Sequence, residues 1–224
     1  MLQINDKTIK GVIFDMDGTM IDNMMVHHRA WQRILAKYGV DLPLEEVKKR
    51  IHGVNKEILK REFGDRFTEE ERVKISAEKE AAYREIFKPQ LRLIDGLDAF
   101  LQQLKAANIP MAIGTAAPGE NADFVMDELQ LRSLFPTVVH AGHVSKGKPD
   151  PEVFEKAAAG IGVPLADCLV FEDSPTGAEA IHRGGATAIL VTTTHEPVEF
   201  AHLPNVARFI KDFTELQLGD YIVK

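Results

Sequence analysis

The chain has 224 residues, 45% of them hydrophobic, and its 27 basic and 34 acidic residues give a formal net charge of −7. This length allows one large domain, or one domain that carries a smaller one. The acidic balance argues against nucleic acid as a partner, because phosphate backbones are bound by a surplus of Lys and Arg. The sequence contains no run of about 20 apolar residues, which a membrane span requires.

Two features of the sequence indicate where the protein is located. The N-terminal segment MLQINDKTIK lacks the apolar stretch of a signal peptide. Cys168 is the one cysteine, so it cannot form an internal disulfide, which fits a reducing compartment. We therefore expect a cytoplasmic protein that has no membrane partner.

Five short β-branched runs are spread along the chain. They are GVIFDMD from Gly11, PMAIGT from Pro110, TVVHAG from Thr137, CLVFED from Cys168 and TAILVT from Thr187. Each run ends at a small, acidic or hydroxyl residue, which is typical of buried strands in a parallel sheet.

The segment between the first two runs is much longer than an ordinary connection between a strand and a helix. The pattern there is helical throughout and rich in charge, four helical segments are predicted in it, and Pro89 ends the last of them. They are VHHRAWQRILAKYG, LPLEEVKKRIHG, NKEILKREFG and TEEERVKISAEKEAAYREIF. We predict a small α-helical domain over residues 22–93, inserted into a domain formed by residues 1–21 and 94–224.

Helical patterns also separate the later strands. A helix is expected over residues 95–108, and three more in ENADFVMDELQLRSLF, PEVFEKAAAGIG and TGAEAIHRGG. Alternation of strands and helices predicts an α/β fold with a doubly wound, Rossmann-like parallel sheet and right-handed crossovers.

Acidic residues end two of the predicted strands. Asp15 and Asp17 follow the first strand, and Glu172 and Asp173 end the fourth. Two solvated acids in a turn would explain either pair alone. Two acidic strand ends at the ligand-binding edge of one parallel sheet instead indicate a site for a hard cation, and oxygen ligands favour Mg²⁺ over zinc.

Two further residues can hold an anion near this edge. Thr115 ends the second strand, where its hydroxyl and backbone N–H can bind an anionic oxygen or simply begin a helix. Lys148 lies on the loop SKGKP, where it can balance the acids and a phosphate, or be a solvated loop lysine.

Together these pieces resemble the haloacid dehalogenase superfamily. The motifs are FDMDGT, the threonine after the second strand, GKPDPEVF and FEDSPTG, and they span Asp15 to Gly177. The helical insertion resembles the small cap of this family. The segments IDNMMVHHRAW and IHGVNKE resemble its branch of β-phosphoglucomutases and sugar-phosphate phosphatases.

The resemblance implies a role for each core residue. Asp15 would be the nucleophile that becomes an aspartyl phosphate, and Asp17 the general acid and then the base. Thr115 and Lys148 would bind the transferring phosphoryl group. The magnesium ligands would be Asp15, the backbone carbonyl of Asp17, Asp173, and Glu172 directly or through water.

The resemblance also implies four substrate-binding residues. His27 resembles a position that orients the general acid, and Lys56 falls where the mutases have an arginine for a second phosphate. Lys79 would be a second cation of the cap, although a lysine on a helix is more often solvated, and a solvated lysine is the expectation from the residue alone. Ala116, beside Thr115, is the fourth residue expected to bind the substrate.

Some positions depart from the mutase pattern. Asn23 stands where the mutases carry threonine, and Ala117-Pro118 stands where they carry a serine and a lysine. Lys56 keeps the charge of the mutase arginine but loses its bidentate geometry.

We therefore expect a Mg²⁺-dependent phosphohydrolase that acts on a small phosphorylated sugar or related metabolite. The alternatives are a β-phosphoglucomutase-type phosphotransferase and, more remotely, a non-catalytic phosphate-binding module. We expect a monomer. A nucleotide-binding loop in GHVSKGKP is disfavoured because Pro149 stands where such a loop needs Ser or Thr. His140 and His143 have no acidic or cysteine partner at ligand spacing and are interpreted as loop residues.

Overall fold

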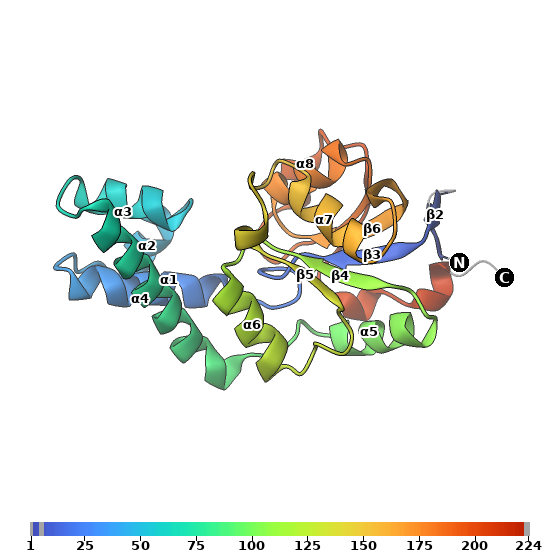
Figure 1. The fold of residues 1–224 in the computed structure, drawn as a ribbon, viewed down its shortest axis with the longest axis horizontal. Helices are drawn as coiled ribbons and strands as arrows, with labels where there is room; N and C mark the ends of the chain where they lie inside the picture. The colour runs from blue at the N-terminus through green and yellow to red at the C-terminus, as the bar shows by residue number, and fades with distance from the viewer. Residues whose placement is uncertain (1, 5–6, 222–224) are drawn as a thin grey trace. The chain divides into compact units, whose positions relative to one another are not determined.

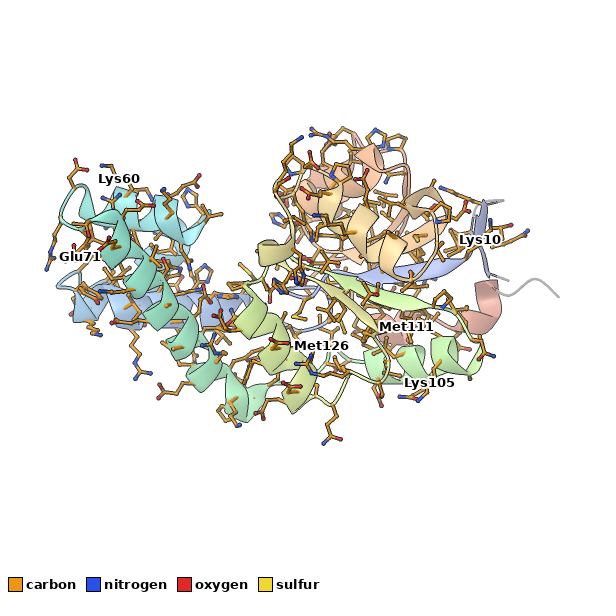
Figure 2. All side chains as sticks on the ribbon, in the orientation of Figure 1. Lys10, Lys60, Glu71, Lys105, Met111 and Met126 are labelled. Carbon is orange, nitrogen blue, oxygen red and sulfur yellow. The ribbon has the colours of Figure 1, made fainter. Side chains whose placement is uncertain are left out.

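A computed structural model describes residues 2–4 and 7–221 of the chain. The described residues form two compact units, each with its own core. The first, which we call the sheet unit, contains the chain up to Asp22 and from Leu91 onward. The second, the helical unit, contains Asn23–Gln90. Figure 1 labels strands β2–β6 in the sheet unit and helices α1–α4 in the helical unit, and Figure 2 adds the side chains in the same orientation.

The sheet unit is built on a six-stranded parallel sheet with the order β5-β4-β3-β6-β7-β8. Its inner strands are buried along their whole length, because helices pack on both faces. The strands are β3 (Gly11–Phe14), β4 (Met111–Gly114), β5 (Thr137–Val139), β6 (Cys168–Glu172), β7 (Thr187–Val191) and β8 (Val206–Ile210). The predicted doubly wound parallel sheet is therefore confirmed.

Three strands were not predicted. The edge strand β8 is only partly buried, so VARFI lacks the continuous apolar run of the inner strands. An antiparallel hairpin of β1 (Leu2–Ile4) and β2 (Lys7–Ile9) precedes the sheet, and its three-residue strands are too short to show a pattern.

Four helices cover the sheet: α5 (Leu97–Ala106), α6 (Gly119–Glu128), α7 (Glu152–Gly160) and α8 (Pro175–Arg183). Figure 1 shows α7 and α8 on one face of the sheet and α5 and α6 on the other. The helix predicted to run to Phe135 stops at Glu128 instead. Gln130 has a φ of 55°, a left-handed conformation that ends a helix, and the following Leu131 and Phe135 are buried from an irregular segment.

Aromatic packing holds the two central strands of this sheet together. Phe14 of β3 and Phe171 of β6 stack with ring centroids 4.9 Å apart, and Phe100 and Phe213 pack against the same cluster. Burial of each such ring stabilises the fold by about 2 to 3 kcal/mol. Because both Phe14 and Phe171 lie next to strand ends, this cluster places the residues that follow them.

The helical unit contains α1 (Met24–Lys37), α2 (Leu44–Arg50), α3 (Asn55–Phe63) and α4 (Glu69–Phe87). All four predicted helical segments are present. Their apolar faces meet in one core of Trp31, Ile34, Leu35, Val47, Ile51, Ile58, Leu59, Phe63 and Ile75. A capping box of Thr68 and Glu71 begins α4, because each side chain accepts the backbone N–H of the other. No helix among the described residues has the length and hydropathy to cross a membrane.

Candidate active site

Three neighbouring strands bring the predicted core residues to one edge of the sheet. Asp15 follows β3, Thr115 follows β4, and Glu172 and Asp173 lie at the end of β6. These strands are adjacent in the order β4-β3-β6, and all run in the same direction. The backbone N–H of Asp15 donates to the carbonyl of Phe171 at 2.9 Å, so the ladder extends to this residue. All four side chains are buried.

Lys148 joins two of these carboxylates. Its Nζ lies 2.6 Å from Asp15 Oδ1 and 2.8 Å from Glu172 Oε1, and its side chain is only 7% exposed. Burial alone would lower the pKa of Lys148, but attraction to Asp15 and Glu172 outweighs burial and raises the pKa above its ordinary value. Lys148 is therefore a buried ammonium ion at the sheet edge and not a solvated loop lysine.

The loop that carries Lys148 is held by one carboxylate at the start of α7. Glu152 Oε2 accepts hydrogen bonds from the backbone N–H and hydroxyl of Ser145 and from the backbone N–H of Lys146, at 2.8 to 2.9 Å. A hydrogen bond from Lys156, followed by these bonds from Ser145 and Lys146, lowers the pKa of Glu152 to about 2. Glu152 thus fixes the loop segment that precedes Lys148. Its position in the motif GKPDPEVF did not predict this role.

Three buried carboxylates gather around the same point. Oxygen atoms of Asp15, Glu172 and Asp173 lie within 4.8 Å of one another. In the part of the chain that the structure describes, this is the only such group of His, Cys, Asp and Glu side chains. Burial raises the pKa of Asp15 well above its ordinary value, and burial followed by Glu172 raises the pKa of Asp173 to about 7. All donors are hard oxygen atoms, and this donor set fits Mg²⁺.

The carboxylate of Glu172 also accepts hydrogen bonds from the neighbouring backbone. Its Oε2 accepts the backbone N–H of Asp173 at 2.6 Å and of Ser174 at 2.5 Å, while Oε1 accepts from Lys148. Gly177, in the first turn of α8, leaves room for this carboxylate, because a Cβ there would lie 1.6 Å from Glu172 Oε1. The sequence suggested Glu172 only as a metal ligand, and Gly177 was not predicted to matter.

Asp17 lies on the turn that follows β3. Residues 18–20 form the turn directly after Asp17, which bridges to Ile21, and the backbone N–H of Gly18 donates to the carbonyl of Ile21 at 2.8 Å. Gly18 has a φ of 76°, and a Cβ there would lie 2.1 Å from Asp173 Oδ2, so both the conformation and the space require glycine. Asp17 is partly exposed, and its charge contributes to the raised pKa of Asp15. The turn predicted at Asp17-Gly18 is confirmed.

Two of the predicted substrate-binding residues meet inside the helical unit. Lys79 Nζ lies 2.8 Å from His27 Nδ1 and 3.0 Å from Glu80 Oε1, and Lys79 is only 3% exposed. Burial, followed by the charge of Lys79, lowers the pKa of His27 to about 3. The expectation of a solvated lysine is wrong, because Glu80 and His27 partner the ammonium within the fold. Asn55 also donates to Glu80 Oε1 at 2.7 Å.

The other two predicted residues lie at the surface of their own units. Lys56 is exposed on α3, and its Nζ lies 2.5 Å from Glu69 Oε1. Ala116 is exposed directly after Thr115, whose Oγ1 accepts the backbone N–H of Ala117 at 3.0 Å. Among the described residues, no hydrogen bond or ion pair joins Ala116 to the buried carboxylates of the same unit.

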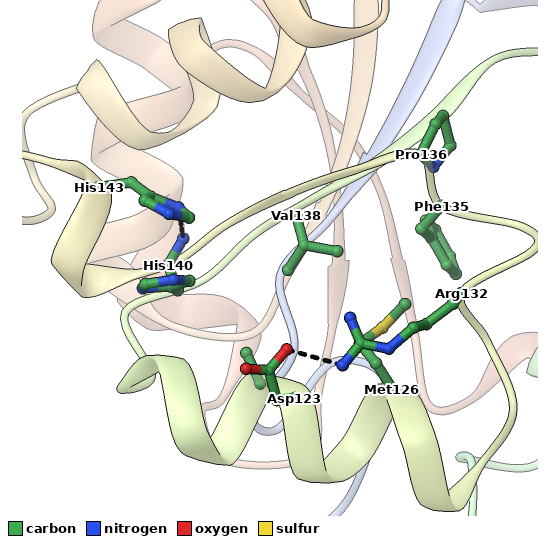
Figure 3. A pocket seen from close by; sticks show the side chains of 9 residues that line it. Asp123, Met126, Arg132, Phe135, Pro136, Val138, His140 and His143 are labelled. Carbon is green, nitrogen blue, oxygen red and sulfur yellow. Dashed lines mark hydrogen bonds and ion pairs between the residues drawn. The ribbon is translucent and has the colours of Figure 1, made fainter.

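The histidines at the end of β5 form a separate feature, shown in Figure 3. His140 and His143 flank a short 3-10 turn, with ring centroids 3.6 Å apart, and line a pocket of about 400 Å³ together with Asp123 and Arg132. The Nδ1 atoms of the two rings accept backbone N–H groups of Gly142 and His140. Both rings therefore serve the local turn, in agreement with their interpretation as loop residues.

Comparison with known proteins gives consistent results. A model of the haloacid dehalogenase-like hydrolases matches residues 9–185. The chain is 28% identical to a validoxylamine A 7′-phosphate phosphatase of Streptomyces hygroscopicus, over 93% of this chain and 96% of the relative. It is 31% identical to a probable pseudouridine-5′-phosphatase of Drosophila melanogaster, with 92% of each covered. It is 32% identical to a β-phosphoglucomutase of Bacillus subtilis, over 81% and 82%.

A solved structure supports the same grouping. The haloacid dehalogenase hydrolase of family IA, variant 3, from Entamoeba histolytica superposes with a TM-score of 0.86 at 26% identity. That match covers 95% of this chain and 97% of the other. Fold, sheet-edge residues and comparisons agree, and the chain belongs to the haloacid dehalogenase-like hydrolases.

Proposed function

We propose that this protein is a Mg²⁺-dependent phosphohydrolase that acts through an aspartyl phosphate on a small phosphorylated sugar or related metabolite. The observation that supports it most directly is the pairing of Lys148 with Asp15 beside Asp173, since a phosphoryl-transfer site needs a nucleophile and cations at one point. Relatives named as phosphatases of phosphorylated small molecules support the substrate class.

In the proposed reaction, an oxygen of Asp15 attacks phosphorus as the bond from phosphorus to the leaving oxygen breaks. Asp17 donates its proton to that leaving oxygen, which departs as an alcohol. Asp17 then takes a proton from water, whose oxygen attacks the phosphorus and releases inorganic phosphate from Asp15. Bound Mg²⁺ would be held by Asp15, Asp173, the backbone carbonyl of Asp17 and Glu172, and would neutralise phosphate charge.

Lys148 and Thr115 would stabilise the same charge from the protein side. Lys148 is already held by Asp15 and Glu172, so its ammonium is positioned before substrate binds and needs little reorganisation. Thr115 offers a hydroxyl at the end of the neighbouring strand. The substrate-binding roles of His27, Lys56, Lys79 and Ala116, the monomeric state and the cytoplasmic location stay predictions.

A second candidate function is phosphoryl transfer between two oxygens of one hexose phosphate. The similarity to β-phosphoglucomutases favours it. The departures from the mutase pattern at Asn23 and Ala117-Pro118, and the lysine that replaces the mutase arginine at position 56, favour the phosphohydrolase.

Phosphorus NMR separates the two functions. Purified protein is given Mg²⁺, β-glucose 1-phosphate and a trace of the 1,6-bisphosphate, and a panel of other phosphorylated metabolites is tested in parallel. The proposal predicts free phosphate from at least one member of the panel, in a reaction that Asp15→Asn abolishes. Conversion to glucose 6-phosphate with little free phosphate would instead identify a mutase.

A further inference from the structure

We propose that two threonines of the loop after β7, Thr193 and Thr194, are positioning residues for the proposed reaction. This inference rests on the proposed function. Thr194 would orient the metal-binding carboxylate of Asp173, and Thr193 would hold the turn that carries Asp17. Neither residue belongs to the motifs that identify the family in this sequence.

The loop begins next to the candidate site because of the sheet order. β7 lies beside β6 in parallel register, with Leu190 opposite Glu172. The chain therefore leaves β7 at the same edge at which β6 delivers Glu172 and Asp173. Three consecutive threonines follow, and each of their hydroxyls has a different acceptor.

Thr194 contacts Asp173 directly. Its Oγ1 donates a hydrogen bond to Asp173 Oδ2, and it also lies 3.3 Å from the Asp173 backbone carbonyl. On the other side, Thr19 Oγ1 donates to Asp173 Oδ1 at 3.3 Å. Each carboxylate oxygen thus receives one hydroxyl, and each keeps a second lone-pair direction for a cation. Hydrogen bonds of this kind orient metal-binding carboxylates and tune their affinity.

Thr193 contacts the turn that follows β3. Its Oγ1 donates to the backbone carbonyl of Gly18 at 2.5 Å. Gly18 is the left-handed residue of the turn, and it packs so closely on Asp173 that only glycine fits. A bond to this carbonyl therefore fixes the residue that directly follows Asp17. Adjacent threonines on one loop link the turn of the predicted acid to the carboxylate of the predicted metal ligand.

Thr192 supplies a matched control from the same loop. Its Oγ1 donates to the carbonyl of Ile210 on β8, at 3.2 Å, and its backbone N–H donates to the same oxygen at 2.8 Å. Thr192→Val removes one hydroxyl-to-carbonyl bond, as Thr193→Val does, but at the far side of β7 from the acidic residues. A purely structural role of the loop predicts similar effects of all three valine variants.

The test measures Mg²⁺ binding by titration calorimetry without substrate, and the Mg²⁺ dependence of phosphate release. Thr194→Val is expected to weaken Mg²⁺ binding about 10-fold and to raise the half-activating Mg²⁺ concentration equally. Thr194→Ser keeps the hydroxyl and is expected to restore both values. Thr193→Val is expected to lower kcat about 10-fold at saturating Mg²⁺ with unchanged Mg²⁺ binding.

Each outcome bears on the inference separately from the proposed function. If Thr194→Val binds Mg²⁺ as tightly as Thr192→Val does, the role of Thr194 is overturned; an unchanged kcat of Thr193→Val overturns the role of Thr193. If Thr194→Val does not fold, Thr194→Ala is measured in its place. A wild-type protein that binds Mg²⁺ but releases no phosphate from any substrate refutes the proposed function, while calorimetry still tests Thr194.

Discussion

Gly177→Ala is predicted to be strongly destabilising, although helix propensity predicts the opposite. Replacing glycine by alanine within a helix ordinarily stabilises it by up to about 1 kcal/mol. Here the new Cβ would lie 1.6 Å from Glu172 Oε1 and 2.0 Å from its Cδ. Ordinary contacts need more than 3 Å, so the Glu172 carboxylate must move or α8 must shift.

The loss of stability follows from the contacts that Glu172 makes. Its displacement breaks the contact with Lys148 and the two backbone N–H bonds from Asp173 and Ser174. Disruption of a buried ion pair costs about 3 to 5 kcal/mol, and a buried unsatisfied donor about 1 to 3 kcal/mol. With partial relaxation of α8, we expect a net loss of about 3 kcal/mol. Because Lys148 would also move, activity is expected to fall about 100-fold.

Urea unfolding and phosphate release measure these two effects. Gly219→Ala is the matched control, because a Cβ at Gly219 meets no atom within 4 Å. The control should leave both stability and activity near the wild-type values. A Gly177→Ala protein with wild-type or higher stability and full activity would show that Glu172 does not depend on the space at Gly177, and would refute this reasoning.

Three further predictions concern the nucleophile, the metal and pH. Asp15→Asn should abolish phosphate release and leave the far-UV circular dichroism spectrum unchanged; retained turnover would exclude Asp15 as nucleophile. Chelation with EDTA should remove activity, and added Mg²⁺ should restore it, whereas activity that persists would exclude a metal requirement. Because the pKa of His27 falls from 6.5 to about 3 on folding, the unfolded chain binds the proton, so this residue's stabilisation is complete above pH 6.5 and is lost as the pH falls. From pH 7 to pH 5, urea unfolding should show that the wild type loses about 2 kcal/mol of stability relative to His27→Gln, because the opposing contributions of Asp15 and Asp173, whose pKa values are raised, are common to both proteins. An equal change in both proteins would contradict this prediction.

The residues at the strand ends could be predicted from the sequence for a simple reason. A short buried strand followed by an acid is a local pattern, and parallel strands bring their carboxyl ends to one edge. The sequence alone therefore predicts one edge for Asp15, Thr115, Glu172 and Asp173. The burial of Lys148 could not be predicted from such a local pattern. It depends on a loop that Glu152, on the next helix, holds in place through hydrogen bonds.

Features that depend on tertiary packing could not be predicted. Lys79 has no local signal of burial, since α4 carries charged residues all around and its partners His27 and Glu80 become apparent only in the fold. The edge strand β8 lacks a continuous apolar run. The contacts of Thr193 and Thr194 join residues far apart in the chain, and hydroxyl residues after a strand show no pattern that would indicate them.

The most direct test of the proposed mechanism is to trap the phosphorylated aspartate. The protein is mixed with Mg²⁺ and a substrate that it turns over, quenched within the first turnover, and treated with borohydride, which reduces an aspartyl phosphate to homoserine. Mass spectrometry of the peptide that contains Asp15 then locates the modification. We predict homoserine at residue 15 only when Mg²⁺ and substrate are both present. Full Mg²⁺-dependent phosphate release without homoserine at residue 15, or with homoserine at Asp17 instead, would contradict the assignment of Asp15 as the nucleophile.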